Sequence, residues 1–416
     1  MWKRWRTRIL LFLAVLGPGF ITANVDNDSG GILTYSQAGA QYGYTLLWTL
    51  IPITIALIVV QEMCARMGVV TGKGLSDLIR EEFGLRLTVI LMVLLVVVNY
   101  TNVVTEFIGI AGSLHLFHVT KFISVPLCAV LVWLLVVKGS YKSTEKIFLV
   151  ASLVYISYIF AGVLAQPDWH ESLRATWHLP ASSVWRDKAY IYTAIAVVGT
   201  TIAPWMQFYL QSSVVEKGIR VKDYPASRLD VIVGSLFTDI VAWFIIVACA
   251  ATLFVHGMGA IQVAADAAEA MRPLAGDYAF ILFAFGLFNA SLFAASILPL
   301  STAYTVCEGL GVESGVDKGF RDAPFFYWLY TLLIACGAAT VLLLPDAQLI
   351  NFAILSQVLN GVLLPVIVIL MLLLINRRDL MGAHRNSRLW NLIAWSTSII
   401  VIGITLMLLW SMIPGH

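Results

Sequence analysis

Charged residues are scarce in this sequence. Asp, Glu, Lys and Arg together make up 12% of its 416 residues, whereas hydrophobic residues make up 60%. A soluble globular domain carries about 25% charged residues. The composition therefore excludes such a domain and, with its strongly positive mean hydropathy, is typical of a polytopic membrane protein. The basic residues fall in short clusters between apolar segments, which excludes a nucleic-acid-binding face and leaves the lipid bilayer as the expected partner.

Cysteine pairs and catalytic motifs are also lacking. The five cysteines lie apart in apolar stretches without CxxC spacing, so we interpret them as small buried residues and expect neither disulfides nor a thiolate metal site. The chain contains no HExxH, no GxSxG and no His-carboxylate pair at catalytic spacing. We therefore expect no enzyme and no resident cofactor. Because no soluble domain or low-complexity linker is present, residues 1–416 are expected to form one membrane domain.

Eleven apolar segments are long enough to cross about 30 Å of hydrocarbon. They cover approximately residues 10–40, 44–69, 87–114, 120–138, 146–165, 189–216, 229–255, 276–306, 325–344, 347–375 and 389–412. We therefore expect an all-α protein with eleven transmembrane helices.

The basic residues are distributed unevenly between alternate loops. When the N-terminus is placed in the cytoplasm, only five of the 26 Lys and Arg residues lie outside: Lys121, Arg174, Arg186, Lys188 and Arg272. This asymmetry follows the positive-inside rule. It predicts a multi-pass protein of the plasma (inner) membrane with a cytoplasmic N-terminus and an external C-terminus.

Two of the segments are interrupted by polar or helix-breaking residues. Residues Asp26 to Gly31 read DNDSGG; Asp and Ser compete for backbone hydrogen bonds and paired glycines weaken a helix, so the first helix is expected to open there. Segment six contains GTTIAP, in which Pro204 removes a backbone donor and frees carbonyls near Thr200. Breaks in the first and sixth segments predict an inverted repeat of five plus five helices. The repeats would cover about 10–165 and 189–375, followed by an extra helix at 389–412.

Hard oxygen ligands dominate the first interruption. Asp26, Asn27 and Asp28 offer carboxylate and amide oxygens, and the freed carbonyls would add more. Such ligands suit magnesium, calcium or manganese better than copper or zinc.

Several stretches, spread over nearly the full chain in one register, carry a family resemblance. They read GPGFITANVDNDSGG, QAGAQYGYTLLW, QEMCARMGVVTGKGLSDLIREEFG, TEFIGIAG, GTTIAPWMQFYLQSSVV and SQVLNGVLLP. Together they resemble the Nramp divalent-metal transporters. The resemblance implies a LeuT-like fold, eleven or twelve helices and alternating access.

The sequence departs from the family at the metal site that the resemblance implies. The family's Asp-Pro-Gly-Asn motif aligns with residues 28–31, so Asp28 matches the metal-binding aspartate and Gly31 replaces the asparagine. Its Met-Pro-His motif aligns with residues 203–205, where Ala203 replaces the methionine and Trp205 replaces the histidine. Loss of the thioether makes the site harder and roomier, which favours hydrated magnesium over manganese. The pattern resembles the Nramp-related magnesium transporters, the branch that lacks the sixth-helix methionine.

The expected metal site follows from this alignment. It comprises Asp28, carbonyls near Gly31 and Thr200, the space at Ala203, Gln357 of the tenth segment, and Asp26 as an extra carboxylate that the common pattern lacks.

A proton pathway is largely missing. Glu106 matches the family's third-helix glutamate, but Val103 stands where an acidic residue is usual, and no arginine lies in the ninth segment. Glu106 and Trp205 are thus all that is left of the pathway implied by the resemblance, and a titratable relay is absent. We therefore expect facilitated uptake of Mg²⁺, with Mn²⁺ as a second transported ion, driven by the ion gradient and the membrane potential without proton coupling.

Three alternatives remain open. The chain could be a proton-coupled Mn²⁺ or Fe²⁺ transporter, a Ca²⁺ transporter, or an amino-acid or organic-solute symporter of the same fold. In the symporter, Gly30 and Gly31 would cradle a substrate carboxylate at a helix N-terminus. Asp28 beside that cradle argues against an anionic group. The oligomeric state cannot be read from the sequence.

Other polar and aromatic residues receive a structural interpretation. Asp230 and Asp239 in segment seven are expected to serve helix packing or interfaces, because polar groups inside a membrane often bond between helices. Trp169, Trp177 and Trp185, in the longest external loop, are interpreted as an interfacial aromatic belt.

Overall fold

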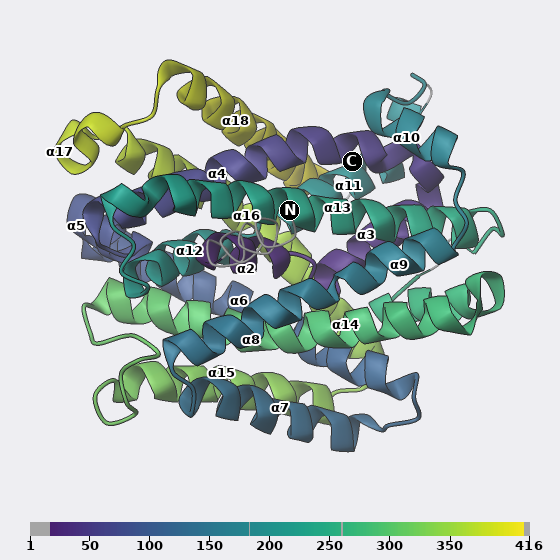
Figure 1. The fold of residues 1–416 in the computed structure, drawn as a ribbon, viewed down its shortest axis with the longest axis horizontal. Helices are drawn as coiled ribbons and strands as arrows, with labels where there is room; N and C mark the ends of the chain where they lie inside the picture. The colour runs from purple at the N-terminus through teal and green to yellow at the C-terminus, as the bar shows by residue number, and fades with distance from the viewer. Residues whose placement is uncertain (1–16, 183, 259–260, 412–416) are drawn as a thin grey trace, which may run out of the picture.

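The computed structural model describes residues 17–182, 184–258 and 261–411, and every regular element in these ranges is a helix (Figure 1). The longer helices are α2 (Pro18–Asn24), α3 (Ser29–Tyr42), α4 (Leu50–Thr71), α6 (Leu85–His115), α7 (Lys121–Val137), α8 (Tyr141–Val154), α9 (Ile156–Leu164), α11 (Lys188–Thr201), α12 (Pro204–Glu216), α13 (Tyr224–Cys249), α14 (Ala264–Leu310), α15 (Pro324–Leu343), α16 (Asp346–Ile375) and α18 (Arg388–Ser411). Shorter elements are η1 (Gly43–Thr49), α5 (Leu75–Phe83), α10 (Trp169–Trp177), η2 (Val184–Arg186), η3 (Val221–Asp223), the π-helical η4 (Ala250–Phe254), α17 (Arg378–Met381) and η5 (Gly382–His384). The all-α prediction is confirmed.

The first predicted interruption is present but lies earlier than expected. The chain leaves the helix after Asn24 and re-enters it at Ser29, so the break covers residues 25–28 rather than 26–31. Asp28 is extended and caps α3 by accepting a hydrogen bond from the Gly31 amide. Because this cap starts the helix, Gly30 and Gly31 lie in its first turn and do not unwind it.

The second interruption depends on a proline. Helix α11 continues through Gly199 to Thr201, and Ala203 is extended (φ −78°, ψ 145°) before Pro204 begins α12. A residue before proline avoids the helical region, whereas proline itself is well tolerated as the first residue of a helix. Pro204 therefore ends one helix and starts the next, and Gly199 is not part of the break.

The two broken helices lie inside the bundle. Helix α13 packs along α2, α3 and α4, while α11 lies against α3 and α16. Helix α6 packs between α14, α15 and α16. Figure 1 shows α7 and α15 side by side at the edge of the bundle, where they also pack against each other. The polar interruptions are thus enclosed by complete helices, as irregular backbone in a membrane requires.

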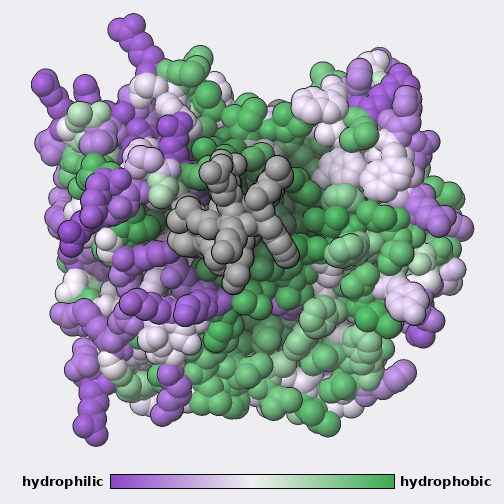
Figure 2. All heavy atoms as spheres, in the orientation of Figure 1, coloured by the Kyte–Doolittle hydropathy of each residue, from purple (hydrophilic) through white to green (hydrophobic). Residues whose placement is uncertain are grey.

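The loops separate into two ends, as the sequence predicts. At one end, the loops expected in the cytoplasm contact one another: the Tyr141 amide donates to Asp317, Lys217 pairs with Glu145, and Arg377 pairs with Glu82. Hydrophilic residues gather towards the two ends of the molecule in Figure 2, and a largely hydrophobic surface lies between them. The alternation of loops fits the prediction, while the assignment of inside and outside remains a prediction.

Fewer continuous spans appear than the sequence suggests. Eight described segments combine the length and hydropathy of a membrane span: Ser29–Thr71, Leu85–His115, Tyr141–Leu164, Lys188–Glu216, Val221–Phe254, Met271–Leu310, Pro324–Leu343 and Leu355–Ile375. The first of these joins two predicted segments through η1, and Lys121–Val137 is apolar but shorter than the others. The count of eleven and the five-plus-five repeat remain predictions.

Short helices occupy regions that the sequence presents as loops. Helix α10 lies in the long loop with the three tryptophans and packs against η1. Its Trp169 stacks on Trp243 of α13, with ring centroids 6.4 Å apart. Trp177, in contrast, is 73% exposed, as an interfacial residue would be. Of the tryptophans in this loop, Trp169 therefore has a packing role and Trp177 is exposed.

Candidate metal site

The candidate site is built around the N-terminus of α3. Oδ1 of Asp28 accepts a hydrogen bond from the Gly31 amide at 2.7 Å, and the Asp28 side chain is partly exposed. The break before it leaves the carbonyls of residues 25–27 outside both helical ladders. Asp28 therefore presents a carboxylate beside unwound backbone.

Gln357 of α16 lies directly beside this cap. A Cβ atom placed on Gly30 would lie 2.1 Å from Nε2 of Gln357 and 3.3 Å from Oδ1 of Asp28. The two predicted ligands thus lie on either side of Gly30, and a larger residue there would displace the end of the Gln357 side chain. Helix α16 is fixed to α6 in this region by reciprocal bonds between Asn102 and Asn360, at 3.1 and 2.9 Å.

Glu106 of α6 completes this side of the site. Its Oε2 accepts a hydrogen bond from the Ser29 amide at 3.1 Å, while its buried Oε1 has no hydrogen-bond partner among the described residues. A Cβ atom on Gly109 would lie 2.4 Å from the Ser29 hydroxyl and 2.2 Å from that of Ser291. Helices α3, α6 and α14 therefore approach closely here, and Glu106 is a neighbour of Asp28.

Asp26 faces the end of the other broken helix. The Tyr35 hydroxyl lies 2.8 Å from Oγ1 of Thr201 and donates to Oδ2 of Asp26 at 3.4 Å. Thr200 lies in the same last turn of α11, where helix carbonyls lack intrahelical partners. The structure therefore brings Asp26 and the carbonyl end of α11 together through Tyr35.

Ala203 and Trp205 lie at the start of α12. Ala203 is buried at the break. When the nitrogen and oxygen of the Gln207 side-chain amide are exchanged, its nitrogen donates to the Ala203 carbonyl at 2.7 Å. Trp205 is also buried, and its carbonyl accepts a hydrogen bond from Ser301 at 3.1 Å. These contacts run along α12 and to α14; they do not join Ala203 or Trp205 to Asp28 or Glu106.

The ligand chemistry is that of oxygen. Within the described ranges, no group of three His, Cys, Asp or Glu side chains is placed to hold a metal ion. An ion here would need carboxylate, amide and carbonyl oxygens together with retained water, which is the usual environment of Mg²⁺.

A cavity of about 490 Å³ reaches the site from the end with the predicted external loops. Ser29 forms its inner limit, and His115, Gln262 and Asp266 lie among the residues of its outer part. Towards the end with the predicted cytoplasmic loops, the cavity between Pro18 and Tyr209 measures only about 10 Å³. A space of that size holds no more than about one water molecule. Of these two cavities among the described residues, the larger therefore opens towards the end with the predicted external loops.

Asp230 of α13 binds the start of α2. Its Oδ1 accepts from the amides of Gly17 and Phe20 at 2.7 and 3.1 Å, and its Oδ2 accepts from the Gly19 amide at 2.8 Å. Amides at a helix N-terminus bind a carboxylate strongly because they lack intrahelical acceptors. The predicted interface role of Asp230 is therefore that of a clamp between α2 and α13.

The sequence profile described as Nramp, natural resistance-associated macrophage protein-like, matches residues 19–411. The chain belongs to the Nramp family. It is 28% identical over 427 residues to "Divalent metal cation transporter MntH" of Deinococcus radiodurans, covering 98% of this chain and 91% of that protein. A protein of the same name from Nostoc is 28% identical over 411 residues, covering 95% of this chain and 90% of its own length. These relatives are named as transporters, which confirms the prediction that the chain is not an enzyme.

Solved structures share the fold of this Nramp protein. The Eremococcus coleocola manganese transporter, in complex with an aromatic bis-isothiourea substituted compound, matches with a TM-score of 0.76 at 21% identity, over 97% of this chain and 86% of that one. MhsT in complex with L-phenylalanine matches with a TM-score of 0.58 at 16% identity, over 94% of this chain and 98% of that one. The predicted LeuT-like fold is confirmed.

Some contacts at the site were not expected from the sequence. Tyr35 is central to the link between Asp26 and Thr201. Its position seven residues after Asp28, on the same helix face, was the available indication in the sequence that it lies near the break. The Asn102–Asn360 pair joins residues 258 positions apart, and nothing in the local sequence of either partner indicates it.

Proposed function

We propose that this Nramp protein is a divalent metal cation transporter that carries Mg²⁺, with Mn²⁺ as a second ion, by alternating access and without proton coupling. The observation that carries the proposal is the meeting of Asp28 and Gln357 across Gly30, beside unwound backbone. Asp28 offers a carboxylate, Gln357 places Nε2 towards Gly30 and would bind an ion through Oε1 after rotation of its amide, and no sulfur ligand accompanies them in the proposed site. The relatives named as divalent metal cation transporters support the substrate class.

Selectivity for Mg²⁺ rests on what surrounds the carboxylate. The proposed ligands are Asp28, Asp26, Gln357 and carbonyls near Gly31 and Thr200, with Ala203 leaving room for retained water. Mg²⁺ is bound through few protein ligands and keeps several waters, whereas a thioether would favour a softer ion. The extra carboxylate of Asp26 increases the local negative charge and so favours a divalent ion over a monovalent one.

The absence of proton coupling rests on the packing of α6 against α15. Val103 is fully buried, and its side chain fills the space beside Gly337 of α15, where a Cβ atom would lie 2.7 Å from Cγ1 of Val103. An apolar contact without ordered polar groups cannot pass protons from Glu106 in this direction. Trp205 adds no titratable group on the α12 side.

The hydrogen bond at the start of α3 weighs against the symporter alternative. A substrate carboxylate would need free amides at that helix N-terminus. Oδ1 of Asp28 already accepts from the Gly31 amide, and a second carboxylate there would be repelled. A proton-coupled Mn²⁺ or Fe²⁺ transporter and a Ca²⁺ transporter remain the competing proposals.

Purified protein in proteoliposomes tests the proposal. Uptake of Mg²⁺ is measured in competition with Ca²⁺, Mn²⁺ and labelled L-phenylalanine while internal pH is recorded. We expect competition by Mn²⁺, no competition by phenylalanine and no uptake by Asp28→Ala. Unchanged Mg²⁺ uptake in Asp28→Ala would remove the proposed site, and uptake of phenylalanine would favour the symporter.

A further inference from the structure

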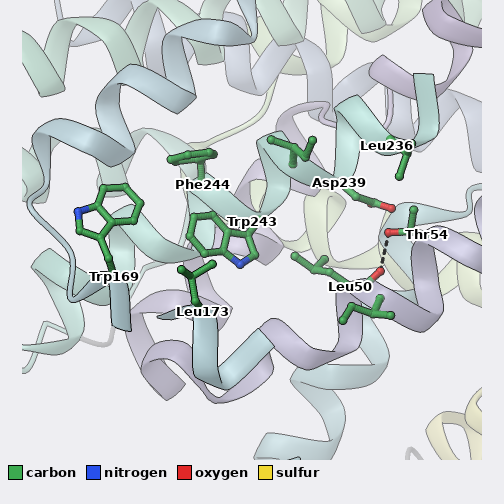
Figure 3. A pocket seen from close by; sticks show the side chains of 10 residues that line it. Leu50, Thr54, Trp169, Leu173, Leu236, Asp239, Trp243 and Phe244 are labelled. Carbon is green, nitrogen blue, oxygen red and sulfur yellow. Dashed lines mark hydrogen bonds between the residues drawn. The ribbon is translucent and has the colours of Figure 1, made fainter. Parts of the chain in front are cut away.

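A second cavity lies on a different face of the molecule from the transport path. It has a volume of about 400 Å³ and is lined by residues of α4, α10 and α13. Figure 3 shows Trp169, Trp243 and Phe244 grouped at one end of it, and Asp239 beside Thr54 at the other. The volume falls in the range of small-molecule pockets, which are mostly apolar with a few placed polar groups.

The polar group in this pocket is a carboxylate without a counter-ion. Asp239 is only 5% exposed, and neither of its oxygens forms a hydrogen bond of normal geometry among the described residues, although the Thr54 hydroxyl lies beside them. That hydroxyl donates its proton to the Leu50 carbonyl at 2.7 Å. None of the ion pairs formed by described residues includes Asp239. A carboxylate buried in this way is stabilised either by taking up a proton or by pairing with a cation.

The opposite end of the pocket is a fixed aromatic wall. Trp169 stacks on Trp243 with an interplanar angle of 17°, and Phe244 meets Trp243 edge-on at 5.0 Å. Nε1 of Trp243 donates to the Thr176 hydroxyl of α10 at 2.8 Å, which holds the indole in place. Aromatic faces of this kind bind flat apolar groups and also attract cations.

The positions of the carboxylate and the aromatic side chains along the pocket determine which kind of cation fits. Asp239 lies 15 residues along α13 from Tyr224 and 10 residues before Cys249, or about 22 and 15 Å of helix rise. The carboxylate is therefore near the middle of the helix, whereas Trp169 belongs to α10, which lies in the predicted external loop. A phospholipid has the opposite arrangement, because its charged headgroup stays at the surface and its tails lie deep. A small cation that enters with its charge first and keeps its apolar body outward matches the pocket.

We propose that this pocket binds small aromatic ammonium ions, with the ammonium group on Asp239 and the ring against Trp243 and Phe244. The site is separate from the cavity that ends at Ser29, which shares none of its lining residues. Binding in the pocket does not depend on which metal the protein carries.

The pocket also communicates with the proposed metal site. Asp239 lies within electrostatic range of Asp26 and of the Tyr35 hydroxyl. In addition, Asn27 donates to the carbonyl and hydroxyl of Thr238, the residue before Asp239, at 3.1 and 2.6 Å. A cation held at Asp239 would weaken the attraction of Asp26 for a metal ion. This second step rests on the proposed transport function and predicts that the ammonium ion inhibits Mg²⁺ uptake.

Binding is tested with the full chain in nanodiscs of phosphatidylcholine and phosphatidylglycerol, without divalent ions. Labelled 2-phenylethylammonium is the probe in equilibrium dialysis, and unlabelled 2-phenylethanol and methylammonium are the competitors. We expect saturable binding that neither competitor displaces at equal concentration, because one lacks the charge and the other the ring. Displacement by 2-phenylethanol alone would show an apolar site without a role for Asp239 and overturn the proposal.

Variants locate the probe. Asp239→Asn keeps the shape of the side chain and removes its charge, so we expect its affinity for the probe to fall at least about tenfold. Leu173→Trp narrows the pocket from α10 without touching the carboxylate and should weaken binding as well; it carries the test if Asp239→Asn does not purify as a folded protein. Asp379→Asn, at an exposed ion pair on α17, is the matched control and should bind normally. Unchanged binding in both pocket variants would overturn the site.

The inhibition is measured separately in proteoliposomes. We expect the probe to slow Mg²⁺ uptake by the native chain and to have a weaker effect on Asp239→Asn at the same concentration. If the probe binds at Asp239 and uptake is unaffected at saturation, the communication with Asp26 is wrong while the binding site stands. If the chain transports no Mg²⁺ at all, the proposed function fails and the dialysis result is untouched.

Discussion

At the scale of single residues, Gly30 lies where an added methyl group would meet a predicted metal ligand. A methyl group there would lie 2.1 Å from Nε2 of Gln357, well inside normal contact distance. We expect Gly30→Ala to displace Gln357 and to lower Mg²⁺ uptake at least tenfold with normal expression. Uptake is compared with that of Gly199→Ala, in which the added methyl group meets no atom within 4 Å.

The control also distinguishes the observed break from the predicted one. Gly199 lies inside α11, where alanine is a better helix former than glycine by about 1 kcal/mol. Gly199→Ala should therefore keep its uptake and gain slightly in thermal stability. Loss of uptake in Gly199→Ala with none in Gly30→Ala would place the functional break at Gly199 instead.

Ala203 is the residue expected to control metal preference. It is buried at the second break, and a methionine there would return a polarizable sulfur to the space that retained water would otherwise fill. We expect Ala203→Met to raise the ratio of Mn²⁺ to Mg²⁺ uptake by about tenfold, measured with both ions in one assay. Ala203→Leu adds similar volume without sulfur, so an equal shift in both variants would attribute the effect to size alone.

At the scale of elements, Asp230 forms a clamp between the start of α2 and α13. The amides of Gly17, Gly19 and Phe20 donate to its buried carboxylate, and hydrogen bonds to charged groups contribute about 1.5–3 kcal/mol each. Asp230→Ala should therefore free the start of α2. We expect at least tenfold faster hydrogen exchange of the amides of residues 17–20, measured by mass spectrometry.

The rest of the chain provides the comparison for this clamp. Exchange within α4 should stay unchanged in Asp230→Ala, and Asp379→Ala, which breaks an exposed pair, should leave α2 protected. Equal acceleration throughout the chain would mean that Asp230 stabilises the whole fold rather than one gate.

Local chemistry explains which of these elements could be predicted from the sequence. Pro204 determines where α12 begins, and Asp28 caps α3, because both effects act within a few residues. The predicted length of the first break was wrong because two glycines weaken a helix only if no cap starts it before them. The partners of Asp230 are more than 200 residues away, and its acceptor role depends on the fold. Helix α10 was missed because it is short and lies in a polar loop.

At the scale of the whole molecule, the sizes of the cavities at the two ends describe the conformation of the transporter. The cavity at the predicted external end reaches Ser29, the residue after Asp28, while the cavity at the predicted cytoplasmic end has room for about one water molecule. The clamp at Asp230 lies beside this smaller cavity, which is lined by Pro18 and Ile21 of α2. We therefore expect separation of α2 from α13 to enlarge it.

The driving force is the last property that belongs to the whole molecule. Two positive charges moving through 100 mV gain about 4.6 kcal/mol, which is sufficient for inward movement without protons. We expect Mg²⁺ uptake into proteoliposomes to rise with an inside-negative potassium diffusion potential and to leave the internal pH unchanged. A pH gradient without a potential should not accelerate uptake, since Val103, at the position where the resemblance expects an acidic residue, packs against Gly337 and carries no titratable group. Stoichiometric internal acidification would show a proton route through Glu106 that bypasses this contact, and Glu106→Gln would then abolish the acidification.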